Sequence, residues 1–159
     1  MNRSSHINTD RWRYMDKDAR VQSTIDTLRQ HLDIDRVVVY TFNSDRVGRV
    51  TFESLSDRQL SILSTSGADD CFNSEYTKLY EDGRIRVMVD IELEPIQSCH
   101  REFLRGLKIR SNFIVPILID RKLAGLLVAH HCQAIYDWSA AHIQVMQATA
   151  QDLATIGNL

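Results

Sequence analysis

Two neighbouring residues, Cys99 and His100, are the first candidates for chemistry in this chain. Ser98 before them is a residue type that caps helices, so we expect Cys99 in the first turn of a helix that runs to Leu107. The unpaired N–H groups and the dipole at a helix start favour a thiolate, which is the nucleophile that adds to an alkene. His100 could donate a hydrogen bond or carry a proton. The alternative is a small buried cysteine beside a solvated histidine.

A second cysteine, Cys71, ends the small polar stretch of residues 64–70. Asp69 and Asp70 come directly before it, and carboxylates beside a thiol raise its pKa unless they point elsewhere. A loop cysteine next to an inward-facing aspartate is unusual for a purely structural segment, so we regard Cys71 as a candidate site residue. The alternative is an exposed, unused thiol with solvated aspartates.

The third cysteine, Cys132, follows His130 and His131 at the end of an apolar run. A zinc site shared with Cys99 and His100 is conceivable, but no CxxC or HxxxH spacing supports it, and we expect no metal. Cys132 should face the core or the next loop. An odd number of cysteines indicates free or chemically used thiols rather than a disulfide framework.

Length and composition limit the classes of protein to consider. The chain has 159 residues, 43% hydrophobic and 25% charged, as in one globular domain. Its formal net charge of -2 gives no electrostatic case for binding nucleic acid. No stretch approaches the roughly 20 apolar residues of a membrane span, and residues 1–10 lack the apolar core of a signal peptide. We therefore expect a cytoplasmic domain without membrane contact.

The apolar pattern predicts the elements that position these residues. Apolar side chains at helical spacing between residues 21 and 32 predict a helix from Asp10, after a disordered leader of residues 1–9. Further helices are expected at residues 57–63, 73–80, 99–107 and 137–159. Strands are expected at residues 36–42, 47–55, 84–89, 110–119 and 122–130.

This order of elements predicts an α+β fold. We expect a central, mostly antiparallel sheet with the terminal helices on one face and loops on the other. The apolar stripes of the terminal helices either cover the core or pair with a second copy of the chain, which would give a homodimer.

Three segments, residues 98–104, 109–117 and 123–130, followed by Trp138, resemble the GAF domain of a cyanobacteriochrome. Cyanobacteriochromes are bilin-binding photoreceptors related to phytochromes. The stretch Asp69-Asp70-Cys71-Phe72 resembles the Asp-X-Cys-Phe motif of their two-cysteine subgroup. The resemblance implies a GAF domain over residues 10–159, with a bilin pocket on the sheet face opposite the terminal helices.

The resemblance also implies a role for each cysteine and its neighbours. Cys99 would form the thioether to ring A of a linear tetrapyrrole, phycocyanobilin or phycoviolobilin. Cys71 would add reversibly to the central methine carbon, with Phe72 as part of its motif. His100 would stack under the pyrrole rings or hydrogen-bond to them, and Asp69 would accept hydrogen bonds from their N–H groups.

Three more positions belong to the implied pocket. Tyr80 matches a residue that contacts a propionate, and His130 matches a residue near ring D. Asn112 is a further donor available to the propionates. These roles predict a photosensory domain without catalysis, which photoconverts by isomerisation of the bond to ring D and acts on an attached output domain.

Two alternatives remain for a GAF fold with these residues. The first is a thiol enzyme similar to the GAF-fold reductases of free methionine sulfoxide, with Cys99 as the nucleophile and Cys71 as the resolving thiol. The second is a domain that binds cyclic nucleotides without a covalent bond.

Overall fold

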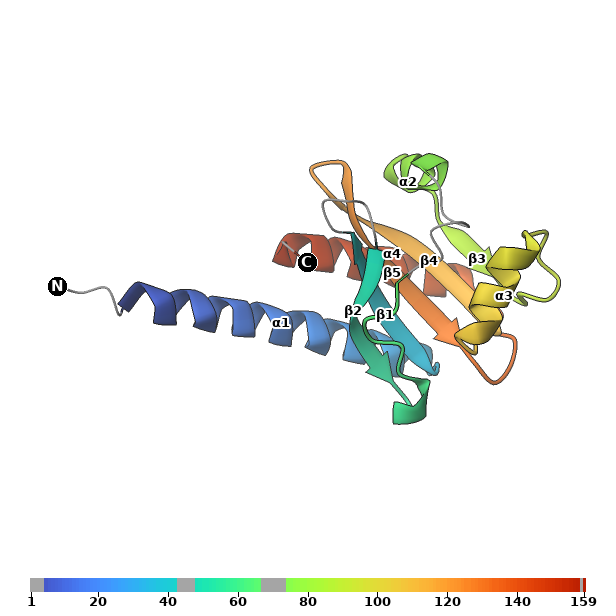
Figure 1. The fold of residues 1–159 in the computed structure, drawn as a ribbon, viewed down its shortest axis with the longest axis horizontal. Coiled ribbons are helices and arrows are strands. Elements are labelled where there is room, and N and C mark those ends of the chain that lie inside the picture. Colours follow the sequence, from blue (N-terminus) through green and yellow to red (C-terminus); the bar gives the residue numbers. More distant parts are fainter. Residues whose placement is uncertain (1–4, 43–47, 67–73, 158) are drawn as a thin grey trace.

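The computed structural model describes residues 5–42, 48–66, 74–157 and 159. Its centre is a five-stranded sheet with the strand order β2-β1-β5-β4-β3, in which every neighbouring pair is antiparallel (Figure 1). The strands are β1 (Arg36–Phe42), β2 (Gly48–Leu55), β3 (Arg86–Met88), β4 (Ser111–Ile119) and β5 (Lys122–His131). The helices are α1 (Ser5–Leu32), α2 (Ser74–Glu81), α3 (Ser98–Gly106) and α4 (Ala140–Ile156), with a 3-10 helix η1 (Arg58–Leu60). The predicted α+β fold is confirmed.

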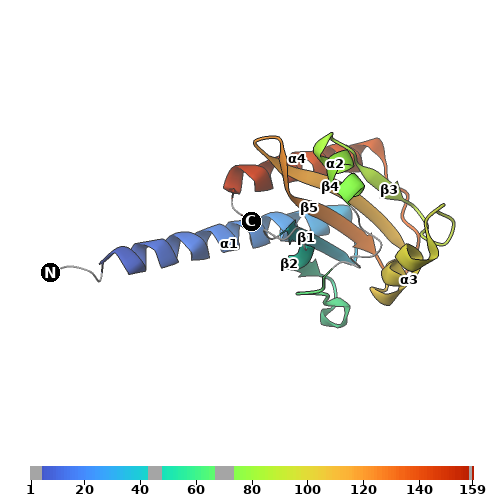
Figure 2. The same ribbon diagram turned by 45° about the horizontal axis from the view of Figure 1, so that its top comes forward.

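The two faces of the sheet have different neighbours because side chains alternate along each strand. Odd-numbered residues of β1, β4 and β5 form the main core with α1 and α4; they include Val37, Val39, Phe113, Val115, Leu127 and Ala129. Even-numbered residues form a second cluster on the opposite face; they include Val38, Ile114, Leu126 and Val128. Figures 1 and 2 show α1 and α4 along one face of the sheet and α2 and α3 on the other side. The predicted placement of the terminal helices is confirmed.

Helix α1 begins earlier than the sequence pattern indicated. It starts at Ser5 rather than at Asp10, so residues 5–9 are helical and do not form a disordered leader. Its apolar stripe, Val21, Ile25, Leu28 and Leu32, is at most 3% exposed. The N-terminal part of α1 extends away from the sheet (Figure 1). Among the described residues, no helix is long and apolar enough to cross a membrane.

Two other helices differ from their predicted bounds. The predicted helix at residues 57–63 is only the 3-10 turn η1, for which the Asp57 carboxylate accepts a hydrogen bond from the N–H of Gln59. Helix α4 starts at Ala140 because Ser139 caps it: the Ser139 hydroxyl accepts from the N–H of His142, and the His142 ring accepts from the N–H of Ser139.

Local backbone chemistry explains how β4 and β5 fit into the sheet. The turn between them, Asp120 and Arg121, has φ values of 52° and 65°, as a two-residue hairpin requires. Pro116 lies beyond the short strand β3, which pairs only with residues 112–114 of β4, so its missing N–H breaks no pairing on that side. Gly125 allows close pairing with β1, since a Cβ there would lie 2.6 Å from the carbonyl oxygen of Tyr40.

Candidate functional site

A cavity of about 60 Å³ lies between the even-numbered face of the sheet and helix α3. Most of its wall is apolar, with Val38, Leu126 and Val128 from the sheet and Phe103 and Leu107 from α3 and its end. Its polar side chains are His100, Asn112, His130, Tyr40 and Thr65. An apolar cavity with a few converging polar groups is the usual form of a small-molecule site.

The polar end of this cavity is a row of three residues on adjacent strands. Arg36 of β1 lies opposite His130 of β5, and His130 lies opposite Asn112 of β4. Directly opposed residues of an antiparallel pair project from the same face of a sheet. Strand pairing therefore brings together residues 36, 112 and 130, and places all three side chains on the cavity side.

Arg36 is completely buried, with 0% exposure. Its Nε donates a hydrogen bond of 3.0 Å to Nδ1 of His130, its Nη1 donates to the carbonyl oxygen of Leu60 at 2.6 Å, and its Nη2 donates to that of Leu107 at 2.7 Å. Burial lowers the pKa of Arg36, and the nearby Cys132, Glu53 and Asp35 oppose that shift. An arginine remains a cation even so.

Sequence reasoning gave Arg36 no role, although a signal was present. The segment 36–42 reads as a buried strand, and alternation puts Arg36 on the same face as Val38. A guanidinium on the apolar face of a buried strand must have partners, because an unpaired buried charge is very costly.

His130 is a neutral ring in this environment. Burial first, and the charge of Arg36 second, hold the pKa of His130 well below its usual range. Since Nδ1 accepts the hydrogen bond from Arg36, the single proton of the neutral ring lies on Nε2. Nε2 has no hydrogen-bond partner in the part of the chain that the structure describes.

Helix α3 carries both members of the Cys99–His100 pair. Cys99 lies in the first turn, as predicted, but the capping residue is Gln97 rather than Ser98, and the Gln97 side chain makes no capping bond. Cys99 is exposed, whereas His100 is 7% exposed and lines the cavity. The alternative of a buried cysteine beside a solvated histidine is therefore wrong. Burial and the charge of Arg86 lower the pKa of His100.

The cysteines differ in bonding state. Cys99 is disulfide-bonded, which differs from the free or chemically used thiol that we expected, and its thiol chemistry requires the reduced form. Cys132 is a free, half-buried thiol whose pKa is raised by burial. Within the described ranges, no group of histidine, cysteine and carboxylate side chains could hold a metal ion.

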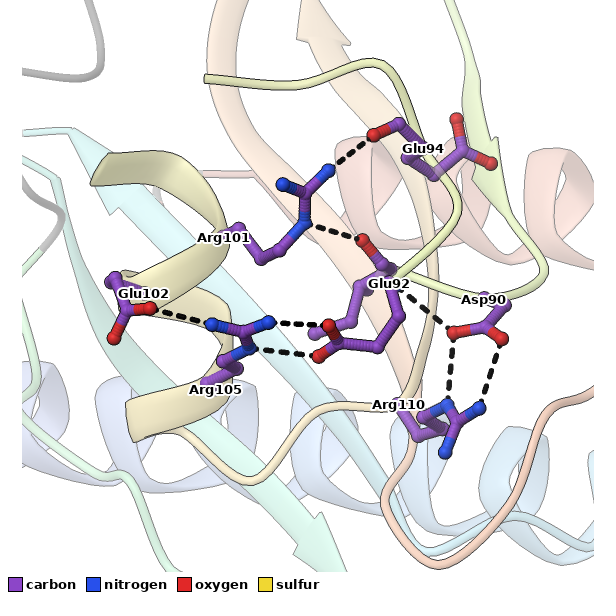
Figure 3. Close-up of polar contacts among 8 residues, drawn as sticks. Asp90, Glu92, Glu94, Arg101, Glu102, Arg105 and Arg110 are labelled. Carbon is purple, nitrogen blue, oxygen red and sulfur yellow. Dashed lines mark hydrogen bonds and ion pairs between the residues drawn. The ribbon is translucent and has the colours of Figure 1, made fainter. Parts of the chain in front are cut away.

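Charged residues fix α3 to the segment that precedes it (Figure 3). Arg101 of α3 donates from Nε to the carbonyl oxygen of Ile91 at 3.1 Å and from Nη2 to that of Glu94. Arg105, one turn further, holds the carboxylate of Glu92 with two nitrogens. The hydrogen bond from Arg105 is the main reason that the pKa of Glu92 is lowered. The helix that carries Cys99 is thus anchored on its outer side.

The remaining predicted site residues lie in different places. Tyr80 of α2 is 2% exposed and packs in the apolar cluster on the cavity face, but it does not line the cavity. Asn112 lines it, and its buried Oδ1 accepts no hydrogen bond from the described residues. Asp69, Cys71 and Phe72 lie outside the residues that the structure describes.

Residues 16–156 match the model of the GAF domain family, and the chain belongs to that family. It is 39% identical over 142 residues to an uncharacterized protein of Picosynechococcus sp., a match that covers 89% of this chain and 87% of the other. It is 30% identical to the circadian input-output histidine kinase CikA of Thermosynechococcus vestitus, over 82% of this chain but only 19% of the kinase.

Solved GAF domains have the same architecture. The blue-light absorbing form of the PixJ GAF domain of Thermosynechococcus elongatus superposes with a TM-score of 0.75 at 31% identity, covering 88% of both chains. The phycocyanobilin-bound GAF domain of a cyanobacterial phytochrome superposes with a TM-score of 0.79 at 26% identity, covering 98% of this chain and 93% of that one. The chain thus has the fold of bilin-binding photoreceptor GAF domains.

Proposed function

We propose that this chain is a photosensory domain, not an enzyme, that holds a linear tetrapyrrole through a thioether at Cys99. The observation that carries the proposal is the divergence of two neighbours at the start of α3: Cys99 is exposed, whereas His100 turns into an apolar cavity. A pigment lying in the cavity could contact His100 while its edge reaches Cys99. The similarity to bilin-bound GAF domains supports this arrangement.

The polar groups of the site suit the chemistry of a bilin. Pyrrole N–H groups are donors, and the buried Oδ1 of Asn112 is an acceptor without a described partner. A bilin carbonyl oxygen is an acceptor, and Nε2 of His130 carries a proton. Arg86 is a half-buried cation on the cavity side of β3, near His100, and could bind a propionate, a role for which the oxygen of Asn112 is unsuited. Arg84, also half-buried, is a second candidate two residues earlier in the chain.

The volume of the cavity sets a condition on loading. The cavity measures about 60 Å³, whereas sites for drug-sized ligands measure roughly 300–1,000 Å³. A four-ring pigment therefore needs more room than this arrangement offers. Loading would therefore move side chains such as Phe103 of α3 and Leu107 at its end, or carry part of the pigment past Ile62 and Thr65, which also line the cavity.

Two thiols with different tasks complete the proposal. The bilin, phycocyanobilin or phycoviolobilin, supplies light absorption and isomerisation of the bond to ring D. Cys99 provides permanent attachment, and Cys71 of the Asp-X-Cys-Phe motif adds reversibly to the central methine bridge. Addition there divides the conjugated system, so absorption moves to the blue; release restores it. Asp69 accepts hydrogen bonds from the pyrrole N–H groups. Tyr80 contacts a propionate once loading has widened the cavity, because in the present arrangement it is buried and does not line the cavity.

Co-expression with bilin-producing enzymes tests the attachment. A coloured protein that keeps its pigment after denaturation is expected for the wild type under reducing conditions, and Cys99→Ala should release the pigment. Cys132→Ala is the matched control, because Cys132 does not line the cavity. A colourless wild type would reject the proposal.

We further propose that the domain works as the input module of a longer cytoplasmic signalling protein. The match to CikA covers only 19% of that kinase, which leaves room there for other domains. The projecting part of α1, where Tyr14 and Met15 are 66% and 54% exposed, offers a surface for a homodimer through the terminal helices. Sedimentation of the loaded domain tests this, and a strictly monomeric domain would contradict it.

A further inference from the structure

Arg36 links three segments that lie far apart in the sequence, and two of its partners, His130 and Leu107, line the cavity. Its hydrogen bonds reach His130 on β5, the carbonyl of Leu60 at the end of η1, and the carbonyl of Leu107 at the end of α3. Each of its three nitrogens has a different partner, so the guanidinium is held in one orientation. A side chain with a single ammonium could not make these three bonds in one plane.

This fixed orientation determines which nitrogen of His130 carries the proton. A neutral imidazole has one N–H donor and one acceptor nitrogen. Arg36 directs an N–H at Nδ1 over 3.0 Å, so a proton on Nδ1 would place two donors face to face. A doubly protonated ring would do the same and would add charge repulsion inside a buried site. Only the tautomer with the proton on Nε2 fits.

We propose that Arg36 is a positioning residue that keeps His130 in the Nε2-protonated tautomer, so that this end of the cavity always offers a hydrogen-bond donor to the ligand. The proposal rests on the proposed function only in naming a bilin carbonyl oxygen as the acceptor. The cavity would then discriminate against a ligand that presents a donor at this point, because two donors would face each other there.

A purely structural role makes a different prediction. If Arg36 served only to tie Leu60 and Leu107 to the sheet, its replacement would lower stability and leave the His130 ring as it is. Arg36→Lys separates the two roles. Lysine keeps a positive charge that can reach a carbonyl oxygen, but it lacks the planar guanidinium whose Nε donates to Nδ1 of His130.

The first experiment uses the wild-type chain without pigment. Nitrogen-15 NMR of labelled histidine distinguishes the two neutral tautomers and the cation, and loss of one signal set in His130→Gln assigns the ring. At pH 7 we expect a neutral ring protonated on Nε2. A ring protonated on Nδ1, or a cationic ring, would overturn the proposal without any need for an Arg36 variant to fold.

The second experiment compares Arg36→Lys with Arg20→Lys, an exposed arginine of α1, which packs on the opposite face of the sheet. In Arg36→Lys, we expect a mixture of His130 tautomers and, after loading, a shifted visible band with attachment at Cys99 retained. Arg20→Lys should match the wild type in both readouts. An unchanged His130 pattern in folded Arg36→Lys would reject the proposal. Failure of the wild type to bind pigment would reject the proposed function instead, while the NMR result would still stand.

Discussion

Arg110 forms a bidentate ion pair with Asp90: its Nε and Nη2 donate to the two carboxylate oxygens at 2.9 Å each (Figure 3). The backbone adds a third link, because the N–H of Ile91 donates to the carbonyl oxygen of Arg110 at 3.0 Å. The chain leaving β3 is thereby tied to the start of β4. Since Arg101 and Arg105 tie the same segment to α3, helix α3 is connected to the sheet through this loop.

We expect Asp90→Asn to lower stability at neutral pH. The hydrogen bond from Arg110 is the main reason that the pKa of Asp90 lies below its ordinary value of 3.8. A carboxyl whose pKa is depressed by folding adds stability above its unfolded pKa, and this stability is lost as the pH falls through the folded pKa. Urea unfolding should therefore separate variant and wild type at pH 7, and the difference should shrink below pH 3.8.

Asp82→Asn is the control for that measurement. Asp82 is an exposed aspartate whose carboxylate forms no ion pair within the described part of the chain. The unfolding free energy of Asp82→Asn should equal that of the wild type both at pH 7 and below pH 3.8. Equal unfolding free energies of Asp90→Asn and the wild type at pH 7 would show that the ion pair between Arg110 and Asp90 does not stabilise the fold.

Acid should destabilise the fold through His130. Folding lowers the pKa of this buried ring, so the unfolded chain binds a proton more readily below the ordinary value of 6.5. The contribution to stability is complete above pH 6.5 and falls by up to about 1.4 kcal/mol per pH unit as the pH drops below it. His130→Gln should reduce the slope of unfolding free energy between pH 6.5 and 5.

Part of that slope should survive in His130→Gln, because the pKa of His100 is lowered too. The double variant with His100→Gln should flatten the profile further. An identical slope in wild type and His130→Gln would contradict the assignment of a neutral, buried ring, whatever the absolute stability of the variant.

Cys71→Ala should separate colour from attachment. The pigment should stay bound through Cys99 after denaturation, because the first thioether is independent of the second. The blue-shifted state should disappear, since no thiol remains to divide the conjugated system. Absorption spectra in the dark and after illumination measure this. A variant that still forms the blue-shifted state would exclude Cys71 as the reversible nucleophile.

Core packing between the terminal helices and the sheet should dominate stability. Leu153 of α4 is 0% exposed, and Leu153→Ala should cost about 2–5 kcal/mol of unfolding free energy. Leu93→Ala makes the same chemical change at a residue that is 83% exposed and should stay within about 0.5 kcal/mol of the wild type. Urea unfolding compares the two, and equal costs would contradict the described core.

The sheet was predictable because its signal is local. Runs such as residues 37–40 and 123–129 contain only apolar residues and one glycine, and period-two alternation then assigns each side chain to a face. The first-turn position of Cys99 was predictable for the same reason. The start of α1 was not, since residues 5–9 are polar apart from Ile7, and they precede the buried apolar stripe of this helix, which starts at Val21.

The polar end of the cavity required the tertiary structure. The three partners of Arg36 lie at residues 60, 107 and 130, and no short-range pattern connects them. The resemblance to a family suggested His130 and Asn112 but not the residue that orients His130. The size of the cavity also depends on how α3 packs against the sheet, which single-residue patterns do not determine.

The sheet is a single layer of backbone that separates the cavity from helices α1 and α4. On β5, the cavity is lined by Leu126, Val128 and His130. The intervening residues, Leu127 and Ala129, pack in the core with α1 and α4. Dense interiors deform as a whole rather than atom by atom. A change in packing on the cavity side of β5 is therefore transmitted through this strand to the face that contacts α1 and α4.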